Sequence, residues 1–339
     1  MIPMKKVSIQ TGFSWGKLAA ALLVLILAFA VSLVVGAKST TLHEAWQALF
    51  TNASGDNIGL IREIRLPRIA AGLLVGAALA VSGAIMQGLT RNPLADPGLL
   101  GITSGGNAAL ACALAFIPSL TYSGIMLACF VGAAVGALMV FGLGAASKSG
   151  LSSIQLVLAG AAVSALLTAV AEGVALYFKL SKDVSMWTAA GLVGTSWDQV
   201  RSILPFVVIG IIIAIGFARP LTILSLNDST AVGLGLRTGQ VKVILFVMVV
   251  ILSGSSVALV GNMAFMGLMI PHIVRMFAGT DYRNILPLSA VCGAAFMLLA
   301  DTVGRMINAP YETPVAAIIA LLGLPFFLII VRKGGKSLS

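Results

Sequence analysis

Long apolar runs alternate with short polar connections along the whole chain. The runs cover residues 17–37, 68–90, 98–117, 122–146, 151–178, 202–218, 243–262, 264–278, 285–306 and 314–331. A helix crosses a bilayer with about 17 to 25 apolar residues; most runs have this length, while the eighth is short and the fourth and fifth are long. Leu, Ala, Ile and Gly fill the runs, whereas a membrane barrel would need alternating strands of about ten residues. The pattern predicts an all-α membrane protein with ten transmembrane helices.

Composition leaves little room for a soluble part. The chain is 59% hydrophobic and 9% charged, against about 25% charged residues in a soluble domain. The longest polar stretch, 38–67, has about 30 residues, too few for a catalytic or nucleotide-binding domain, and a short helix is predicted at 43–50. We therefore expect one transmembrane domain over residues 1–339, with short tails at 1–16 and 332–339.

The distribution of Lys and Arg predicts the orientation, because basic loops resist translocation. With both termini cytoplasmic, the inner side collects 13 bases and three acids, and the outer side eight bases and seven acids. The net charge of +10 thus reports topology and contact with anionic lipid. Run 17–37 is longer than a signal-peptide core and is predicted to remain as an uncleaved helix.

Small residues inside the runs indicate close helix packing. Glycines recur four residues apart at 72 and 76, 101 and 105, and 132 and 136, a spacing that lets backbones approach closely in lipid. Cys112, Cys129 and Cys292 lie far apart in apolar runs, without metal-ligand spacing. We interpret them as packing residues and expect no metal and no cofactor.

Polar side chains within apolar runs are costly in lipid, so each needs a partner or an aqueous surface. Glu172 is the clearest example, and either it pairs with a base or it lines a water-filled path. Weaker candidates of the same kind are Gln87, Ser104, Asn107, Ser164 and Thr168. Asp301 and Arg305 lie four residues apart on one helical face and are predicted to pair.

Arg62, Arg65 and Arg68 form a basic cluster on the predicted outer side, against the usual charge bias. Pro67 would lie in the first turn of the following helix, where its missing N–H does no harm. Guanidinium groups at a rigid helix start suit recognition of carboxylates on a docking protein, and lipid anchoring is the alternative.

Two sequence blocks carry a family resemblance. The first comprises RLPR at 65–68, VGAALAVSG at 75–83, Gln87 and NPLADPGLLG at 92–101; the second comprises FMGLMIPHIVR at 265–275, DYR at 281–283 and LAD at 299–301. In these blocks, and over about residues 60–331, the chain resembles the FecCD-like permease family of ferric-siderophore and cobalamin ABC importers.

The resemblance implies an architecture and a set of partners. Members of this family have ten helices and work as a pair of permease subunits with two cytoplasmic ATPase subunits and an extracytoplasmic binding protein. The second permease can be a copy of this chain or a related one. The resemblance implies that Arg65, Arg68 and Arg305 dock the binding protein, while Arg62 lies outside the motif.

The same resemblance assigns coupling and gating. The segment LNDSTAVGLG at 226–235 is similar to the short helices that contact the ATPase, and its predicted coupling residues are Asn227, Asp228, Ser229, Thr230, Ala231, Gly233 and Gly235. Inner-gate positions correspond to Asn92, Leu94, Ser152 and Ser153, with Glu172 as a pathway candidate. His272 belongs to the second block but is given no chemistry.

The resulting hypothesis is a non-enzymatic permease in a bacterial cytoplasmic membrane, driven by ATP hydrolysis on separate subunits. A ferric siderophore is the expected cargo, and cobalamin or haem are alternatives within the family. An ion-coupled secondary transporter is the competing class, although it would normally show internal repeats and several buried ionisable residues. An intramembrane enzyme would need a catalytic constellation, which His43 and His272 do not form.

Overall fold

In the computed structural model, which describes residues 14–334 except 37, 39, 146–152, 190 and 310, every secondary-structure element is a helix. Each predicted apolar run contains one main helix: α1 (Trp15–Val34), α4 (Leu66–Thr90), α5 (Ile102–Phe116), α6 (Tyr122–Ala145), α7 (Ser153–Tyr177), α9 (Trp197–Gly216), α12 (Thr238–Val260), α13 (Met266–Ala278), α14 (Tyr282–Ile307) and α15 (Val315–Gly334). Within the described ranges, seven candidate spans are long and apolar enough to cross a membrane, and three shorter apolar helices lie in α5, α13 and α15. The all-α class is confirmed.

Shorter helices connect the main ones. They are α2 (Leu42–Phe50), α3 (Asp56–Leu60), the π-helical turn η1 (Ile61–Arg65), the 3₁₀ turn η2 (Pro97–Leu100), α8 (Ser181–Ala189), α10 (Ala218–Leu226) and α11 (Asp228–Gly233). Helix α2 confirms the short helix expected at 43–50, and a capping box between Thr41 and Glu44 fixes its start. Because α3, η1 and α4 run on without a break, one helical segment extends from Asp56 to Thr90.

Helix α4 is the centre of the bundle. It packs against α14, α12 and α13, and most of its residues are buried. Glycines make these approaches possible: a Cβ on Gly76 would overlap the backbone of Gly293 in α14, and one on Gly83 would overlap Gly267 in α13. Helices α5 and α6 meet in the same way, with Gly101 and Gly105 facing Gly136 and Gly132. The predicted close packing of the spaced glycines at 101, 105, 132 and 136 is thus present.

Substituting Gly105 with alanine is expected to destabilise the bundle by about 1–3 kcal/mol, because the new methyl group would overlap the Gly132 carbonyl oxygen. Gly142 in α6 is the matched control, since a Cβ there meets no atom within 4 Å and alanine favours a helix. Thermal unfolding of both variants in detergent tests this. Equal midpoints for Gly105→Ala and Gly142→Ala would contradict the steric account.

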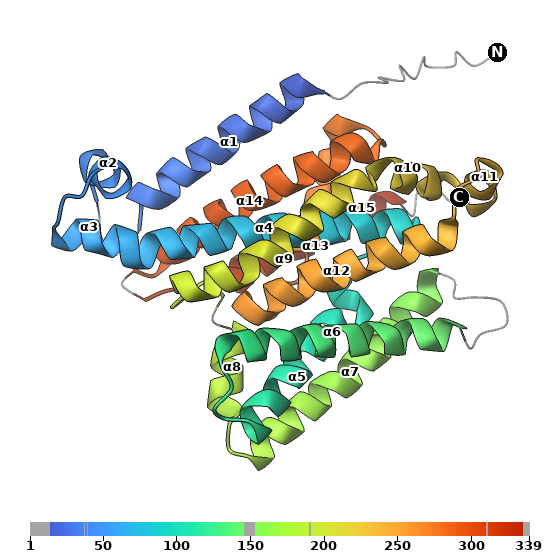
Figure 1. Ribbon diagram of the computed structural model, residues 1–339, viewed down its shortest axis with the longest axis horizontal. Helices are drawn as coiled ribbons and strands as arrows, with labels where there is room; N and C mark the ends of the chain where they lie inside the picture. The colour runs from blue at the N-terminus through green and yellow to red at the C-terminus, as the bar shows by residue number, and fades with distance from the viewer. Residues whose placement is uncertain are drawn as a thin grey trace.

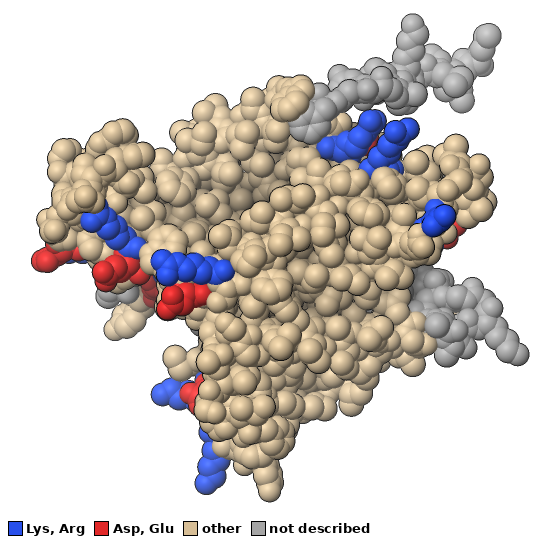
Figure 2. Space-filling view, in the orientation of Figure 1, with Lys and Arg blue, Asp and Glu red and all other residues tan. Residues whose placement is uncertain are grey.

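Charged side chains gather at the two ends of the bundle, with a broad uncharged band between them on the face shown (Figure 2). One end carries α2 and α3, and the other carries α10, α11 and the start of α1 (Figure 1). We call these the outer end and the inner end, following the orientation predicted from the basic loops. Helix α4 runs from one to the other, so it links sites at both ends.

Candidate functional site

Arg68, in the first turn of α4, joins two carboxylates at the outer end. Its Nε donates to both oxygens of Asp301 at 3.0 Å, and its Nη2 donates to Asp301 Oδ1 at 2.8 Å. Its Nη1 donates to both oxygens of Glu312 at 2.8 Å. All three guanidinium nitrogens are therefore engaged in charge-assisted hydrogen bonds. The Asp301 side chain is 2% exposed, whereas that of Glu312 is 32% exposed.

Arg305 shares Asp301 with Arg68 and reaches across to α1. Its Nε lies 3.1 Å from Asp301 Oδ2, which confirms the predicted pair on one face of α14. Its Nη2 donates to the carbonyl oxygen of Ser32 at 3.1 Å and to the Ser32 hydroxyl at 2.8 Å. Arg305 thus ties the end of α1 to α14.

Arg65 closes the C-terminal end of α1. Its Nη1 donates to the carbonyl oxygens of Leu33 and Val34 at 2.7 and 3.0 Å and to Thr40 Oγ1 at 2.7 Å, and its Nη2 donates to the Lys38 carbonyl. The last carbonyls of a helix lack intrahelical partners and carry the negative end of its dipole. The buried guanidinium of Arg65 supplies hydrogen-bond donors for these carbonyls and a positive charge at the negative end of the dipole.

Arg62 does the same for α2. Its Nε donates to the carbonyl oxygen of Ala48 at 2.9 Å, and its Nη2 donates to those of Gln47 and Thr51. The sequence left Arg62 without a role. The structure gives it one, as the residue that caps α2 and fastens it to η1.

The three arginines predicted to dock a partner are all buried, with Arg65 at 5%, Arg68 at 7% and Arg305 at 5% exposed. Arg68 and Arg305 are linked through Asp301, Arg68 also pairs with Glu312, and Arg65 lies beside Arg305 against Gly36. We call the three arginines and the two carboxylates the outer arginine network. It contains three guanidinium groups and two carboxylates, so it carries one net positive charge. Direct contact with a docking protein requires at least one of these side chains to exchange an internal partner.

The predicted coupling segment starts at the last residue of α10 and contains α11, at the inner end. Asn227 separates these two helices and caps α11, because its Oδ1 accepts a hydrogen bond from Ser229 N at 3.2 Å. The helix therefore starts at Asp228, directly after the capping residue. The other predicted coupling residues follow in order: Thr230, the buried Ala231 and Gly233 lie in α11, and Gly235 follows with φ +78°.

Asp228 anchors α11 to the bundle. Its Oδ2 accepts hydrogen bonds from Lys242 Nζ at 2.9 Å and from Arg91 Nη2 at 3.3 Å. The hydrogen bond from Lys242, with the added charge of Arg91, holds the pKa of Asp228 below its usual range. Since Lys242 belongs to α12 and Arg91 follows α4, one carboxylate connects the coupling segment to two long helices.

Apolar side chains of the coupling segment remain uncovered. Leu226 is 69% exposed, Val232 is 60% exposed and Leu234 is 66% exposed. Helices α10 and α11 lie together at the inner end of the bundle (Figure 1). An exposed apolar group with a polar rim is typical of a protein contact.

The predicted inner-gate residues start the connection between α4 and α5. Asn92 Oδ1 accepts a hydrogen bond from Leu94 N at 2.9 Å, which forms a tight Asx turn. Ser152 lies outside the described residues, and Ser153 is the first residue of α7. The structure therefore places Asn92 and Leu94 in a defined turn and says nothing of contact with the serine pair.

Asp96 is a residue in this connection that sequence analysis did not single out. It is 5% exposed, and its Oδ1 accepts a hydrogen bond from Gly98 N at 2.7 Å, capping η2. Its Oδ2 lies against Gly267 at the start of α13. Gln87 also joins α4 to α13, since its amide donates to the carbonyls of Gly267 and Leu268. Gln87 thus holds the last turns of α4 to α13 by hydrogen bonds, and Asp96 lies beside the start of the same helix.

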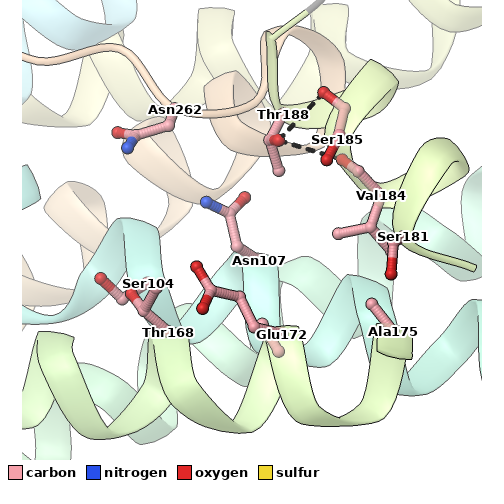
Figure 3. A pocket seen from close by; sticks show the side chains of 11 residues that line it. Ser104, Asn107, Thr168, Glu172, Ala175, Ser181, Val184, Ser185, Thr188 and Asn262 are labelled. Atoms are coloured by element: carbon pink, nitrogen blue, oxygen red, sulfur yellow. Dashed lines mark hydrogen bonds between the residues drawn. The ribbon is translucent and has the colours of Figure 1, made fainter. Parts of the chain in front are cut away.

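Glu172 lies in α7 and lines a pocket of about 420 Å³ between α5, α7 and α8. Figure 3 shows its carboxylate pointing into the pocket toward the Asn107 amide. The rest of the lining is largely polar: Ser104, Thr168, Ser181, Ser185, Thr188 and Asn262. Three of the weaker sequence candidates, Ser104, Asn107 and Thr168, therefore meet at Glu172. No ion pair involves Glu172 within the described part of the chain.

A model of the FecCD transport family matches residues 23–333. The chain belongs to the FecCD transport family. It is similar to the iron(3+)-hydroxamate import system permease protein FhuB of Bacillus subtilis, with 44% identity over 95% of this chain and 84% of the relative. It is also 37% identical to the ferric enterobactin transport system permease protein FepD of Escherichia coli, over 92% of this chain and 93% of the relative.

Two further relatives extend the range of the family. The cobalamin import system permease protein BtuC of Halobacterium salinarum is 37% identical over 80% of this chain and 73% of the relative. The solved inward-facing structure of a metal-chelate type ABC transporter has a TM-score of 0.78 at 27% identity, and the match covers 94% of this chain and 99% of the other.

Membership of the FecCD family confirms the resemblance carried by the two sequence blocks, and the chain is a multi-pass membrane protein. The individual roles of the docking, coupling and gate residues stay predictions. The structure of this FecCD chain adds the contacts that these residues make within the permease. The arginines predicted to dock a partner hold helices together, and Asp228 holds α11 to α4 and α12.

Proposed function

We propose that this chain is the permease subunit of an ABC importer that carries a ferric siderophore across the bacterial cytoplasmic membrane. The observation that carries the proposal is the 44% identity to a hydroxamate permease over nearly the whole chain. The polar pocket at Glu172 supports it, because a polar hollow within an apolar bundle gives a chelate a surface on which to move.

Energy enters from separate subunits in this proposal. Two ATPases bind the exposed apolar residues of α10 and α11, and their closure moves α11 relative to the bundle. Such a motion shifts the inner gate only if the ATPases bind one conformation more tightly than the other. The permease itself hydrolyses no ATP.

The outer arginine network receives the binding protein that delivers the cargo. Arg68 is the residue best placed for direct contact, since Glu312 is the network's partly exposed carboxylate. Arg65 and Arg305 then position Arg68 and the end of α1.

A second permease subunit pairs with this chain in the complete importer. Bacillus subtilis FhuB and FhuG, both described as iron(3+)-hydroxamate import system permeases, are 44% and 34% identical to this chain, which favours a related chain as partner.

Reconstitution tests the proposal. Proteoliposomes containing the permease pair, its ATPases and its binding protein should accumulate an iron-55 hydroxamate chelate when ATP is supplied inside. Vesicles with the permease alone should neither hydrolyse ATP nor accumulate iron. Uptake that persists without ATPases and collapses with a protonophore would instead identify a secondary transporter.

Cobalamin is the alternative cargo, and the identity to a cobalamin permease is the observation that favours it. Competition separates the two cargoes. Excess unlabelled cobalamin should leave uptake of the iron chelate unchanged, whereas excess unlabelled hydroxamate chelate should abolish it. The reverse pattern would assign the system to cobalamin.

A further inference from the structure

The two carboxylates that bind Arg68 differ in how firmly they are held. Asp301 is buried, accepts hydrogen bonds from two nitrogens of Arg68 and also contacts Arg305. Glu312 binds only Nη1 of Arg68 and lies in the connection between α14 and α15. Its side chain is 32% exposed, and the neighbouring Tyr311 is 73% exposed. Glu312 is therefore the ligand that can leave.

We propose that Glu312 occupies Arg68 as an internal substitute for a carboxylate of the docking protein, and that docking exchanges one for the other. This inference rests on the proposed function of the outer arginine network. It adds that Glu312, a residue of the permease itself, competes with the docking protein for Arg68. In the undocked state Glu312 covers Nη1 of Arg68, and in the docked state an acidic side chain of the partner takes this position.

The charges favour exchange of Glu312 for a carboxylate of the partner. They disfavour both a further carboxylate added at Arg68 and the loss of Glu312 without a replacement. The network carries one net positive charge, and replacing one carboxylate by another leaves this balance unchanged. Nη1 of Arg68 thus keeps a carboxylate partner in both states and is not left buried and unpaired, which would be costly. The released Glu312 regains water. The free energy of docking at this contact is the difference between two similar ion pairs, so Glu312 weakens docking and assists release.

The geometry restricts this role to Arg68. Arg65 donates to backbone carbonyls of α1 and to Thr40, and a docking carboxylate would have to break a helix cap to reach it. Arg305 likewise holds Ser32 and Asp301. Gly36 lies next to both guanidinium groups, since a Cβ there would approach Arg65 Nη2 to 3.1 Å and Arg305 Nη1 to 3.2 Å. The loop after α1 therefore covers these two arginines.

Removing the charge of Glu312 should strengthen docking. In Glu312→Gln the amide keeps the shape of the side chain but competes weakly for Arg68. We expect the binding protein that supports uptake in vesicles to bind the complete permease–ATPase complex about tenfold more tightly, mainly through slower dissociation. The complex is immobilised in nanodiscs on a sensor surface, and binding protein is passed over it. The signal gives the association and dissociation rate constants. The effect should shrink as salt concentration rises.

Glu63→Gln is the matched control. Glu63 is an exposed carboxylate in η1 at the same end of the bundle, and it takes no part in the outer arginine network. The Glu63→Gln variant should bind the docking protein as tightly as the wild type does. An equal gain in Glu63→Gln would show a general effect of negative charge and overturn the exchange.

A stability measurement tests the same inference without a partner. Because Glu312 is a displaceable ligand, Glu312→Gln should keep its melting temperature within a few degrees of the wild type, whereas Asp301→Asn should lose much more. Equal losses would show that Glu312 is a fixed structural strut, and would overturn the proposal.

Arg68→Lys separates this inference from the proposed docking function. If Arg68→Lys weakens docking and Glu312→Gln leaves it unchanged, the docking site stands and the exchange is wrong. If neither variant changes docking, the network is not the docking site and both ideas fall. Tighter binding in Glu312→Gln together with weaker binding in Arg68→Lys supports both.

Discussion

Replacing Arg68 with leucine is expected to destabilise the protein by about 3 kcal/mol, because it leaves Asp301 buried with only Arg305 beside it. The substitution also releases Glu312, which loosens the connection between α14 and α15. The loss should appear as a lower midpoint of thermal unfolding in detergent and as a smaller yield of folded protein.

The matched control for Arg68→Leu is Arg201→Leu. Arg201 pairs with Asp198 at 3.6 Å, but the side chains are 75% and 90% exposed, so this pair contributes little. Removing both buried partners together, in Arg68→Leu with Asp301→Leu, should recover only part of the loss, because the buried Asp301 charge is gone but Arg305 loses its carboxylate. If Arg68→Leu melted like Arg201→Leu, the network would not be a structural element.

The apolar runs were enough to place the main helices, because a lipid solvent forces backbone hydrogen bonds inside each segment. Their ends were less well predicted where capping decides them. Helix α9 begins at Trp197, five residues before the apolar run, because Ser196 and Gln199 form a capping box. Helices α8 and α10 were not predicted, since neither is a long apolar segment.

The three arginines and Asp301 of the outer arginine network were found from the sequence, but their environment was not. Arg68 meets partners 233 and 244 positions away, and no local pattern indicates such contacts. Burial was also hidden, because an arginine that caps a helix from another segment looks like a surface residue in the sequence. Glu312 was missed for the same reason: it is an ordinary loop acid until the fold gives it a partner.

Helix α4 connects the two ends of the molecule through these contacts. Its first turn carries Arg68 in the outer arginine network, and Arg91, directly after its last turn, pairs with Asp228. Most of the helix between them is buried against three others, so it behaves as a stiff element. A change at the outer end can therefore bias the inner end if the two ends prefer different positions of α4.

Reversing the charge of Asp228 in Asp228→Arg is expected to lower ATP-driven uptake at least about tenfold while ATP hydrolysis by the assembled complex continues. The substituted guanidinium would face Lys242 and Arg91, so α11 would be pushed away from α12 and α4. Uptake and hydrolysis measured together in proteoliposomes test this. Asp198→Arg, an equally large charge reversal on an exposed outer residue, should keep both at the wild-type level.

The charge swap Asp228→Lys with Lys242→Asp separates the ion pair from the surface that it supports. Partial recovery of uptake is expected, because the swap restores the pair to α12 but leaves Arg91 opposite a new positive charge. Since the pKa of Asp228 is lowered, the wild-type pair should persist through neutral pH and be lost only as the pH falls through that lowered value. Normal coupling in Asp228→Arg would show that α11 transmits no motion through this carboxylate.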